Sequence, residues 1–337
     1  MGHDRRVSPQ FERLTTTIHL QGDGETGLGE DVTYDPDEQR AHREARAVHD
    51  LAGEWTIDGL SRRLEVLDLF LGEEPTYPVE RAYRRWAFES AALDLALRQA
   101  GKPLHELLGR EPRPLTFAVS IRLGDPPDPA GVLERIEAYG TGVRFKLDGE
   151  PSWDDHLLDV LAGTGAVDVF DLKGAYRGTP VDVDTDPGLY RRIAERFPDA
   201  WIEDPDLTVA EADAALRPYR ERITWDAVIH SVADVLALPF APKCLNSKPS
   251  RFGSLAALFD FYDFCAAEGI ELYGGGQSEL HVGRGQIQYL ASIFHPGGSN
   301  DVAPSGWDHA DWARTGLPTS PLDPDPEPIG FRRRNSG

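Results

Sequence analysis

Residues 201–206 read WIEDPD, an apolar pair followed at once by three carboxylates and a proline. Trp201 and Ile202 are typical of a buried β-strand, and acidic residues beside proline are typical of the turn that ends a strand. The pattern recurs, because other short apolar segments of the chain also end on a charged residue. The charged residues at the ends of these segments are the basis for predicting both fold and function.

Beyond residue 113, short apolar segments alternate with amphipathic stretches of helical length. Eight segments have this character: FAVSIR at 117–122, VRFKL at 143–147, VDVFDL at 167–172, AWIED at 200–204, RITWDA at 222–227, KCLNSK at 243–248, IELYGGG at 270–276 and SNDVAP at 299–304. The alternation predicts parallel βα units, and eight such units favour a closed barrel over an open sheet.

The residues before these units have a different pattern. Residues 14–34 alternate as strands do and carry glycine turn signals, whereas residues 36–109 show helical spacing of apolar side chains. We therefore predict an α+β domain over residues 1–113 and an α/β domain, the barrel, over residues 114–316. The proline-rich residues 317–337 predict an extended C-terminal tail that packs little.

The formal charge of −22 disfavours binding to nucleic acid or to an anionic membrane surface, because both would be repelled. The chain has no apolar run of membrane-spanning length, and its N-terminus has no secretory pattern. We expect a cytoplasmic protein whose partner is a small molecule, and homo-oligomerisation is left open.

Lysine is scarce, since only five of the 35 lysine and arginine residues are lysines: Lys102, Lys146, Lys173, Lys243 and Lys248. Arginine keeps its proton at working pH, but lysine can lose one when its surroundings lower its pKa. Each lysine therefore raises the question of a chemical role. Lys102 and Lys243 have structural interpretations, and Lys173 either binds substrate or neutralises nearby acids.

Aligning the predicted strands by their ends brings five charged residues to one mouth of the barrel: Lys146, Asp171, Glu203, Asp226 and Lys248. Three converging carboxylates without arginine partners repel one another unless a cation compensates their charge. Ligands that are all oxygen favour a hard divalent ion, Mg²⁺ first and Mn²⁺ as a substitute. The sequence thus predicts a metal site at the barrel mouth.

At roughly residues 14–305 the chain resembles the enolase superfamily, in particular its muconate-lactonizing and o-succinylbenzoate-synthase branch. The motifs that carry the resemblance are GLGE at 27–30, ESAALDLAL and GKPLHELLG within 89–109, and LNSKPSRFG at 245–253. The resemblance implies a modified TIM barrel of the (β/α)7β type beneath an N-terminal α+β capping domain. It also implies that Asp171, Glu203 and Asp226 are the metal ligands.

The resemblance extends to residues that would act on the substrate. Lys146 matches the second lysine of a K-x-K motif, and Lys248 matches a lysine on the sixth strand, so both are expected to be catalytic. Arg144 replaces the first lysine of K-x-K and is expected to supply a fixed positive charge near the substrate carboxylate. Asp301 is expected either to contact substrate or to cap a turn. Lys173 departs from the asparagine that is common at its position.

The implied activity is that of a Mg²⁺-dependent lyase or isomerase acting on a carboxylate substrate. Lys146 would abstract the α-proton to form a metal-stabilised enolate, and Lys248 would return a proton or remain cationic. The outcome would be cycloisomerisation, epimerisation or syn-dehydration. Two alternatives are open: an aldolase that forms a Schiff base on a lysine and needs no metal, and a non-catalytic barrel that binds a metal-carboxylate ligand.

Overall fold

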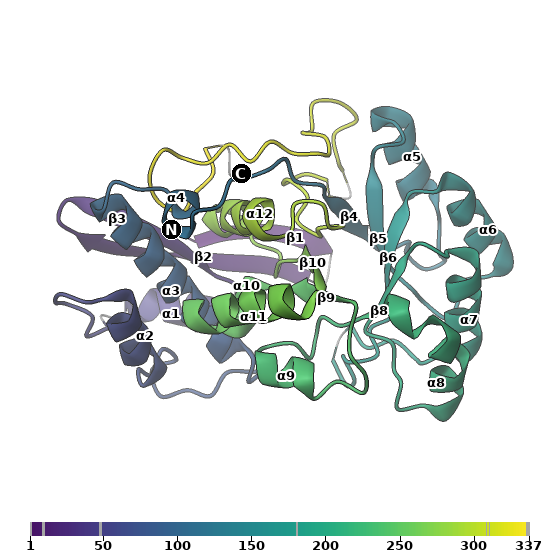
Figure 1. The fold of residues 1–337 in the computed structure, drawn as a ribbon, viewed down its shortest axis with the longest axis horizontal. Coiled ribbons are helices and arrows are strands. Elements are labelled where there is room, and N and C mark those ends of the chain that lie inside the picture. The colour runs from purple at the N-terminus through teal and green to yellow at the C-terminus, as the bar shows by residue number, and fades with distance from the viewer. Residues whose placement is uncertain are drawn as a thin grey trace.

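The computed structural model describes residues 2–8, 11–46, 49–179, 181–307, 309 and 311–334, with side chains from Glu12 onwards within those ranges. Figure 1 shows two bodies side by side, an antiparallel sheet with its helices and a β/α barrel. None of the helices in the described ranges is both long and apolar enough to cross a lipid bilayer.

The first body is a three-stranded antiparallel sheet in the order β1-β2-β3, packed against helices. Its elements are β1 (Gly2–Ser8), β2 (Phe11–Gly22), β3 (Glu25–Asp31), α1 (Pro36–Ala45), α2 (Ile57–Glu65), α3 (Glu80–Gln99) and α4 (Leu104–Leu108). This arrangement confirms the predicted α+β capping domain, while the exact domain limits at residues 113 and 316 stay a prediction.

The glycines of GLGE allow β3 to lie directly on α3. A Cβ atom added to Gly27 would stand 2.0 Å from the backbone oxygen of Ala91, and one added to Gly29 would stand 2.0 Å from that of Ala87. No side chain fits at that separation. The glycines therefore set the closest approach between the sheet and its helix.

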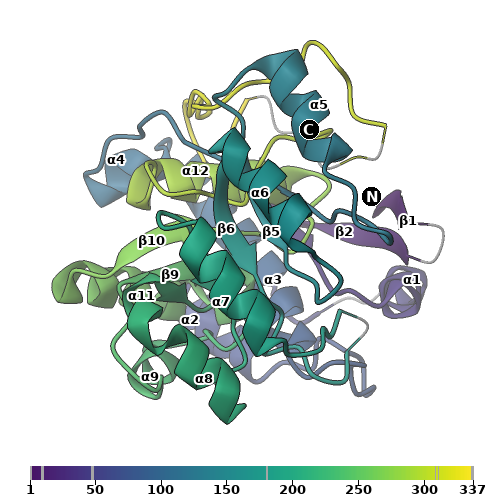
Figure 2. The same cartoon turned by 90° about the vertical axis from the view of Figure 1, so that its right-hand side faces the viewer.

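The second body is the barrel, which begins with β4 and runs to α12. Its elements are β4 (Ala118–Ile121), α5 (Ala130–Tyr139), β5 (Arg144–Asp148), α6 (Asp155–Thr164), β6 (Val167–Asp171), α7 (Pro187–Arg196), β7 (Trp201–Glu203), α8 (Ala210–Leu216), η1 (Arg217–Arg222), β8 (Ile223–Thr224), α9 (Val232–Leu236), β9 (Cys244–Ser247), α10 (Pro249–Phe252), α11 (Leu255–Glu268), β10 (Glu271–Gly274) and α12 (Val282–Phe294). Figure 2 shows α5 to α8 covering the outer face of the strands around β5 and β6.

The barrel strands run parallel in the order β4-β5-β6-β7-β8, and β9 pairs with β10. A backbone hydrogen bond of 3.1 Å from Asn246 to Trp225 joins the two sets. The ring closes through two single parallel bridges, from Asn300 to Phe117 and from Asp301 to Gly275. The eighth strand predicted at 299–304 is thus reduced to these bridges, whereas the other seven segments form strands.

Glu30, the last residue of GLGE, fastens the capping domain to the barrel. Its carboxylate accepts backbone N–H hydrogen bonds from Leu280 at 2.7 Å and Gly283 at 2.8 Å, where α12 begins. The buried Arg13 on β2 donates to the backbone oxygen of Gln277 at 2.7 Å. Because residues 277–283 follow the carboxyl end of β10, these contacts place the cap at the barrel mouth.

The C-terminal tail packs closely, contrary to the prediction for residues 317–337. Phe331 is fully buried and Leu322 nearly so. The Asp94 carboxylate on α3 accepts hydrogen bonds from the Phe331 backbone at 2.8 Å and from Arg332 Nε at 2.6 Å. Its proline content led us to expect a solvated segment, but these contacts anchor the tail to α3.

We predict that Gly29→Ala lowers the free energy of unfolding by at least about 2 kcal/mol, because the added methyl group must displace the backbone of α3. Urea denaturation monitored by circular dichroism measures the effect. Gly163→Ala is the control, because a Cβ atom there meets nothing within 4 Å. Equal stability of the Gly29→Ala and parent proteins would contradict the close approach.

Removal of the Phe331 side chain, which anchors the tail, should also destabilise the protein. Phe331→Ala is expected to lower the free energy of unfolding by about 3–5 kcal/mol, since it leaves a cavity beside Tyr289, whose ring centroid lies 6.0 Å from that of Phe331. The same denaturation experiment on Leu107→Ala, whose side chain is 61% exposed, should change stability by less than about 0.5 kcal/mol. A similar small change for Phe331→Ala would mean that the tail adds little stability.

Candidate active site

Three carboxylates from adjacent strand ends meet at the mouth of the barrel. Asp171 ends β6, Glu203 ends β7 beside it in register, and Asp226 lies two residues beyond β8. All three side chains are fully buried, and one oxygen of each lies within 4.8 Å of the others. The structure thus brings together the three acids that the sequence predicted as metal ligands.

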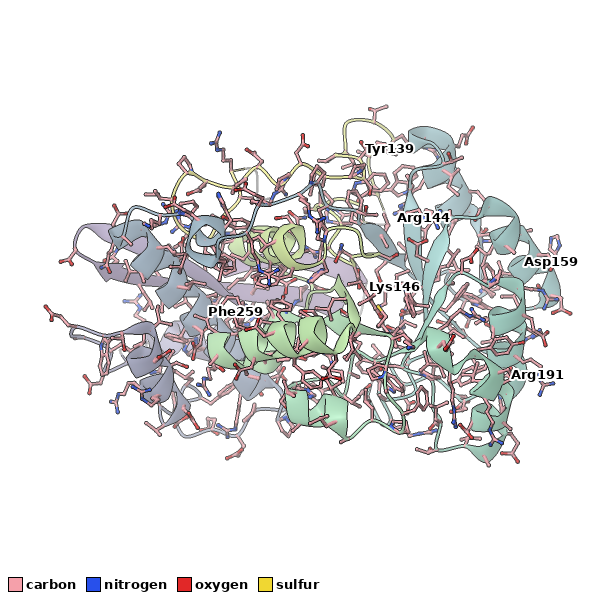
Figure 3. The ribbon with its side chains drawn as sticks, viewed as in Figure 1. Tyr139, Arg144, Lys146, Asp159, Arg191 and Phe259 are labelled. Atoms are coloured by element: carbon pink, nitrogen blue, oxygen red, sulfur yellow. The ribbon has the colours of Figure 1, made fainter. Side chains whose placement is uncertain are left out.

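The two lysines predicted to be catalytic contact this triad from different strands. Lys146, in the middle of β5 and almost fully buried, is ion-paired with Glu203 and lies 3.3 Å from Asp171. Lys248 follows β9, and its Nζ lies 2.8 Å from Asp226 Oδ2. The two amines therefore stand at different corners of the triad (Figure 3 labels Lys146).

Lys173 is a third lysine of the site. Its Nζ lies 2.5 Å from Asp171 Oδ2 and 3.2 Å from Asp148 Oδ1, and its backbone adopts a left-handed φ of 54°. Burial alone would lower the pKa of Lys173, but the carboxylates of Asp148 and Asp171 outweigh it and raise that pKa. The Lys173 amine thus lies between two carboxylates.

The residues predicted to bind substrate take different positions. Asp301 lies at the site, with its carboxylate 3.6 Å from Lys146 Nζ. Arg144 stands at the start of β5, where it donates to Asp168 Oδ1 at 2.8 Å and to the Gly165 carbonyl at 2.7 Å. The structure does not bring Arg144 to the triad, because its guanidinium is engaged by acceptors at the entering end of β6.

The three acids of WIEDPD have three separate roles. Glu203 belongs to the triad. Asp204, held at a φ of 47°, accepts the backbone N–H groups of Asp226 at 2.9 Å and Ala227 at 2.8 Å, and so positions the third acid. Burial raises the pKa of Asp204 to about 6. Asp206 pairs with Arg177 and accepts a hydrogen bond of 2.8 Å from Thr185, which holds the loop after β6.

Several partners of the triad were missed in the sequence. Tyr273 donates its hydroxyl hydrogen to Glu203, and Asn246 Nδ2 lies 3.4 Å from the same carboxylate. The alternation of side chains along a strand could have predicted Asn246, because it is two residues from Lys248 and must lie on the same face. A Cβ atom on Gly275 would stand 2.7 Å from Lys248 Cε, so the glycine run after β10 makes room for the lysine.

Asp226 is held by a second set of partners. Tyr176 donates its hydroxyl hydrogen to Oδ2 at 3.1 Å, and Arg251 donates to the Asp226 carbonyl at 3.0 Å and to the Tyr176 hydroxyl at 2.9 Å. Burial would raise the pKa of Asp226, but Arg251 and Lys248 outweigh it and hold that pKa well below its usual value. Asp226 is therefore a carboxylate and available as a ligand.

The donor set fits a divalent cation. The triad offers only carboxylate oxygens, which hard ions such as Mg²⁺ prefer. Asp226 Oδ1 is buried and has no hydrogen-bond partner among the described residues, so one acceptor of the triad is free to coordinate an ion. A buried acceptor without a partner is costly, and a cation would remove that cost.

Comparison with known proteins identifies both halves of the chain. Residues 111–309 match the model of the "Domain of unknown function (DUF8230) C-terminal domain", and residues 1–107 match that of its N-terminal domain. An o-succinylbenzoate synthase from Geobacillus stearothermophilus is 33% identical over 222 residues, which are 63% of this chain and 57% of that protein. The chain thus spans little more than half the length of that curated relative.

Solved structures share the fold. A member of the enolase superfamily from Listeria innocua superposes with a TM-score of 0.68 at 18% identity, over 90% of this chain and 82% of that one. A dipeptide epimerase from Methylococcus capsulatus, complexed with a Mg ion, gives a TM-score of 0.60 at 24% identity, over 87% and 83%. The barrel beneath its cap thus has the fold of these structures, and the two matched domain models lead to one assignment: the chain belongs to the DUF8230 family.

Proposed function

We propose that this chain is a divalent-metal-dependent lyase or isomerase that removes the α-proton of a small carboxylate substrate. The observation that carries the proposal is the buried triad of Asp171, Glu203 and Asp226 with a lysine at two of its corners. The relatives' names, which include o-succinylbenzoate synthase and dipeptide epimerase, support reactions of this class.

Asp171, Glu203 and Asp226 would hold the metal, for which we propose Mg²⁺ with Mn²⁺ as a substitute. When bound, such an ion acts as a Lewis acid that stabilises the negative charge developing on the substrate carboxylate. The Mg ion of the dipeptide epimerase supports the choice of magnesium.

Lys146 is the proposed base, and its surroundings explain why it depends on the triad. Burial would lower the pKa of Lys146, but Glu203, Asp171 and Asp301 outweigh burial and hold that pKa well above its usual value. An ammonium group cannot accept a proton. Lys146 can therefore act as a base only when positive charge compensates Glu203 and Asp171.

Lys248 is the proposed second catalytic residue. Its partner is Asp226, whereas Lys146 is paired with Glu203. A substrate between the two amines could be deprotonated by one and reprotonated by the other, which gives epimerisation. If Lys248 remains protonated, it stabilises negative charge during elimination or cycloisomerisation.

The remaining polar residues would bind and orient the substrate. We propose that Asp301, 3.6 Å from Lys146, contacts the substrate, and that Lys173 keeps Asp171 ionised. A Schiff-base aldolase would need no carboxylate triad. Trapping of the enzyme by borohydride and substrate in the presence of EDTA would identify that alternative.

Metal binding tests the role of the triad. We expect Glu203→Gln, Asp171→Asn and Asp226→Asn each to weaken Mg²⁺ binding at least about tenfold, because each removes one anionic ligand. Isothermal titration calorimetry measures the affinity, with the exposed Glu211→Gln as a control that removes one negative charge outside the site. Unchanged affinity in all three amide variants would exclude the triad as the metal site.

Hydrogen exchange tests the two lysines. N-succinylamino acids and dipeptides are screened as carboxylate substrates in D₂O with Mg²⁺. We expect Lys146→Arg and Lys248→Arg each to lose the deuteration of the α-position in one of the two enantiomers. Arginine keeps the positive charge but is not a usable base. Mass spectrometry and NMR measure the exchange, and Lys102→Arg is the control, since that lysine is 52% exposed.

A one-base reaction would instead make exchange depend on a single lysine. If both arginine variants exchange every position as fast as the parent, neither lysine is the base. If a carboxylate binds the parent with no exchange at all, the non-catalytic alternative is supported.

A further inference from the structure

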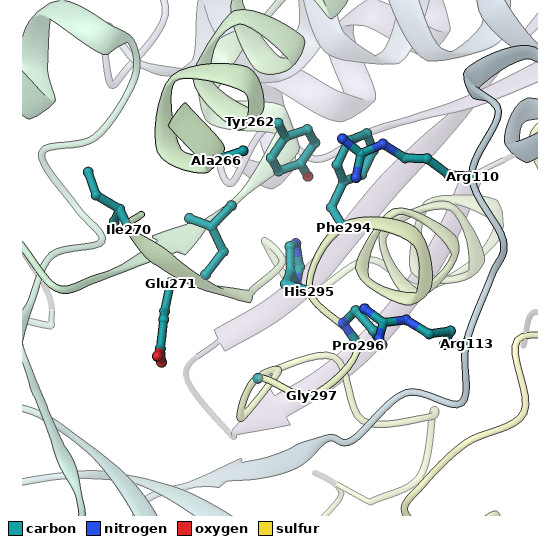
Figure 4. Close-up of a pocket in the computed structure, with 12 residues that line it drawn as sticks. Arg110, Arg113, Tyr262, Ala266, Ile270, Glu271, Phe294, His295, Pro296 and Gly297 are labelled. Atoms are coloured by element: carbon teal, nitrogen blue, oxygen red, sulfur yellow. The ribbon is translucent and has the colours of Figure 1, made fainter. Parts of the chain in front are cut away.

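Two lysines at the mouth of the barrel differ in accessibility. Lys146 lies two residues before the end of β5, and its side chain is only 2% exposed. The side chain of Lys173, which follows β6, is 14% exposed. The pocket in Figure 4 lies at the other end of the strands from the triad, because Ile270 and Glu271 line it where β10 begins. Lys173 is therefore the more accessible of the two amines to a substrate in the mouth.

The register of the strands explains this difference. Asp148 ends β5 and is the register partner of Asp171, which ends β6. Side chains two residues apart on a strand share a face, so Lys146 lies on the same face as Asp148 but deeper in the barrel. The Nζ atom of Lys173 lies between the two acids at the strand ends, 3.2 Å from Asp148 Oδ1 and 2.5 Å from Asp171 Oδ2. Lys173 thus supplies the positive charge that β5 lacks at the level of the triad.

The Lys173 amine has a hydrogen-bond donor to spare. A protonated lysine has three N–H donors, and within the described ranges only the carboxylates of Asp148 and Asp171 accept from this one. The Tyr176 ring, with its centre 5.2 Å from Nζ, borders the group. Asp171 Oδ2 is also only 3.3 Å from Lys146 Nζ, so Asp171 does not depend on Lys173 alone. A ligand oxygen can therefore accept the third hydrogen.

The loop after β6 holds Lys173 in this position. The backbone of Lys173 is left-handed, and its N–H group donates to Asp171 Oδ1 at 3.2 Å. The next residue, Gly174, lies directly on the loop after β7. Its N–H group donates to the Asp204 carbonyl at 2.8 Å, and an added Cβ atom would stand 2.3 Å from the backbone nitrogen of Asp206. The donor is thus positioned before a ligand binds, which is the arrangement that stabilises developing charge best.

We propose that Lys173 contacts the reacting carboxylate of the substrate and donates a hydrogen bond to it as negative charge develops there. This is the role predicted for Arg144 from the sequence, and the guanidinium of Arg144 is held at the entering end of β6 instead. The inference rests on the proposed function, because it concerns the same substrate at the same triad. It makes Lys173 a catalytic residue in addition to a partner of Asp171.

The test is calorimetric titration of the full chain with oxalate at saturating Mg²⁺. Oxalate is a dianion whose oxygens carry negative charge, as do those of an enolate formed from a carboxylate. Lys173→Met is expected to raise the Kd for oxalate at least about tenfold, because it removes a charge-assisted hydrogen bond. Lys173→Arg keeps the charge and should raise Kd less.

Arg122→Gln is the matched control for a general effect of charge. Arg122 Nε lies 2.7 Å from Asp148 Oδ2, and its side chain is 45% exposed. The substitution therefore removes one positive charge near Lys173 but leaves the donor beside Asp171 in place. We expect it to raise the Kd for oxalate by less than about threefold.

Titration with Mg²⁺ alone separates this inference from the proposed function. Lys173→Met should bind Mg²⁺ at least as tightly as the parent, because it removes a positive charge beside a metal ligand. A parent that binds no Mg²⁺ would overturn the proposed function itself. If Lys173→Met instead loses affinity for Mg²⁺ and oxalate in parallel, Lys173 acts only through Asp171, and the direct contact is overturned.

Three further outcomes would overturn the contact while the proposed metal site stands. They are an unchanged Kd for oxalate in Lys173→Met, equal increases of Kd in Lys173→Met and Arg122→Gln, and no binding of oxalate to the Mg²⁺-loaded parent.

Discussion

Three buried carboxylates can share one site only if nearby positive charges and hydrogen-bond donors compensate their negative charge. The triad of Asp171, Glu203 and Asp226 is compensated in this way. Asp171 is paired with Lys173 and Lys146, Glu203 with Lys146 and the Tyr273 hydroxyl, and Asp226 with Lys248, Arg251 and Tyr176. Three of the chain's five lysines are used in this way. The same compensation limits which lysines can act as a base, because a protonated lysine that neutralises a carboxylate cannot accept a proton.

The cap is held over this charged mouth by specific polar contacts. The Glu30 carboxylate occupies the N–H groups at the start of α12, and Arg13 binds the backbone just after β10. Both contacts use buried groups, so their loss would leave unsatisfied polar atoms in the interior. The C-terminal tail adds a third fastening, from Arg332 and Phe331 to Asp94 on α3. A fixed cap would limit the access of water to the mouth, which favours the proposed removal of a proton from carbon.

An acidic residue beside the triad positions the backbone of the site and does not belong to the metal-binding carboxylates. Asp204 follows Glu203 directly, yet its carboxylate turns to the backbone of Asp226 and Ala227. That contact needs the left-handed backbone at Asp204, which a non-glycine residue adopts at some cost. The resulting strain is offset by two hydrogen bonds that fix the next strand end.

The sequence by itself determined the barrel and the identity of the triad. The carboxyl ends of parallel strands share one rim, so an acid at the end of each of three successive strands must meet its neighbours there. Lys146 and Lys248 followed from the same rule. Tertiary structure alone decided which residue pairs with which: Arg144 turns to Asp168, Tyr273 reaches Glu203, and the buried Phe331 anchors the proline-rich tail. Those contacts join residues distant in the chain, and their geometry depends on side-chain directions and packing that no local pattern encodes.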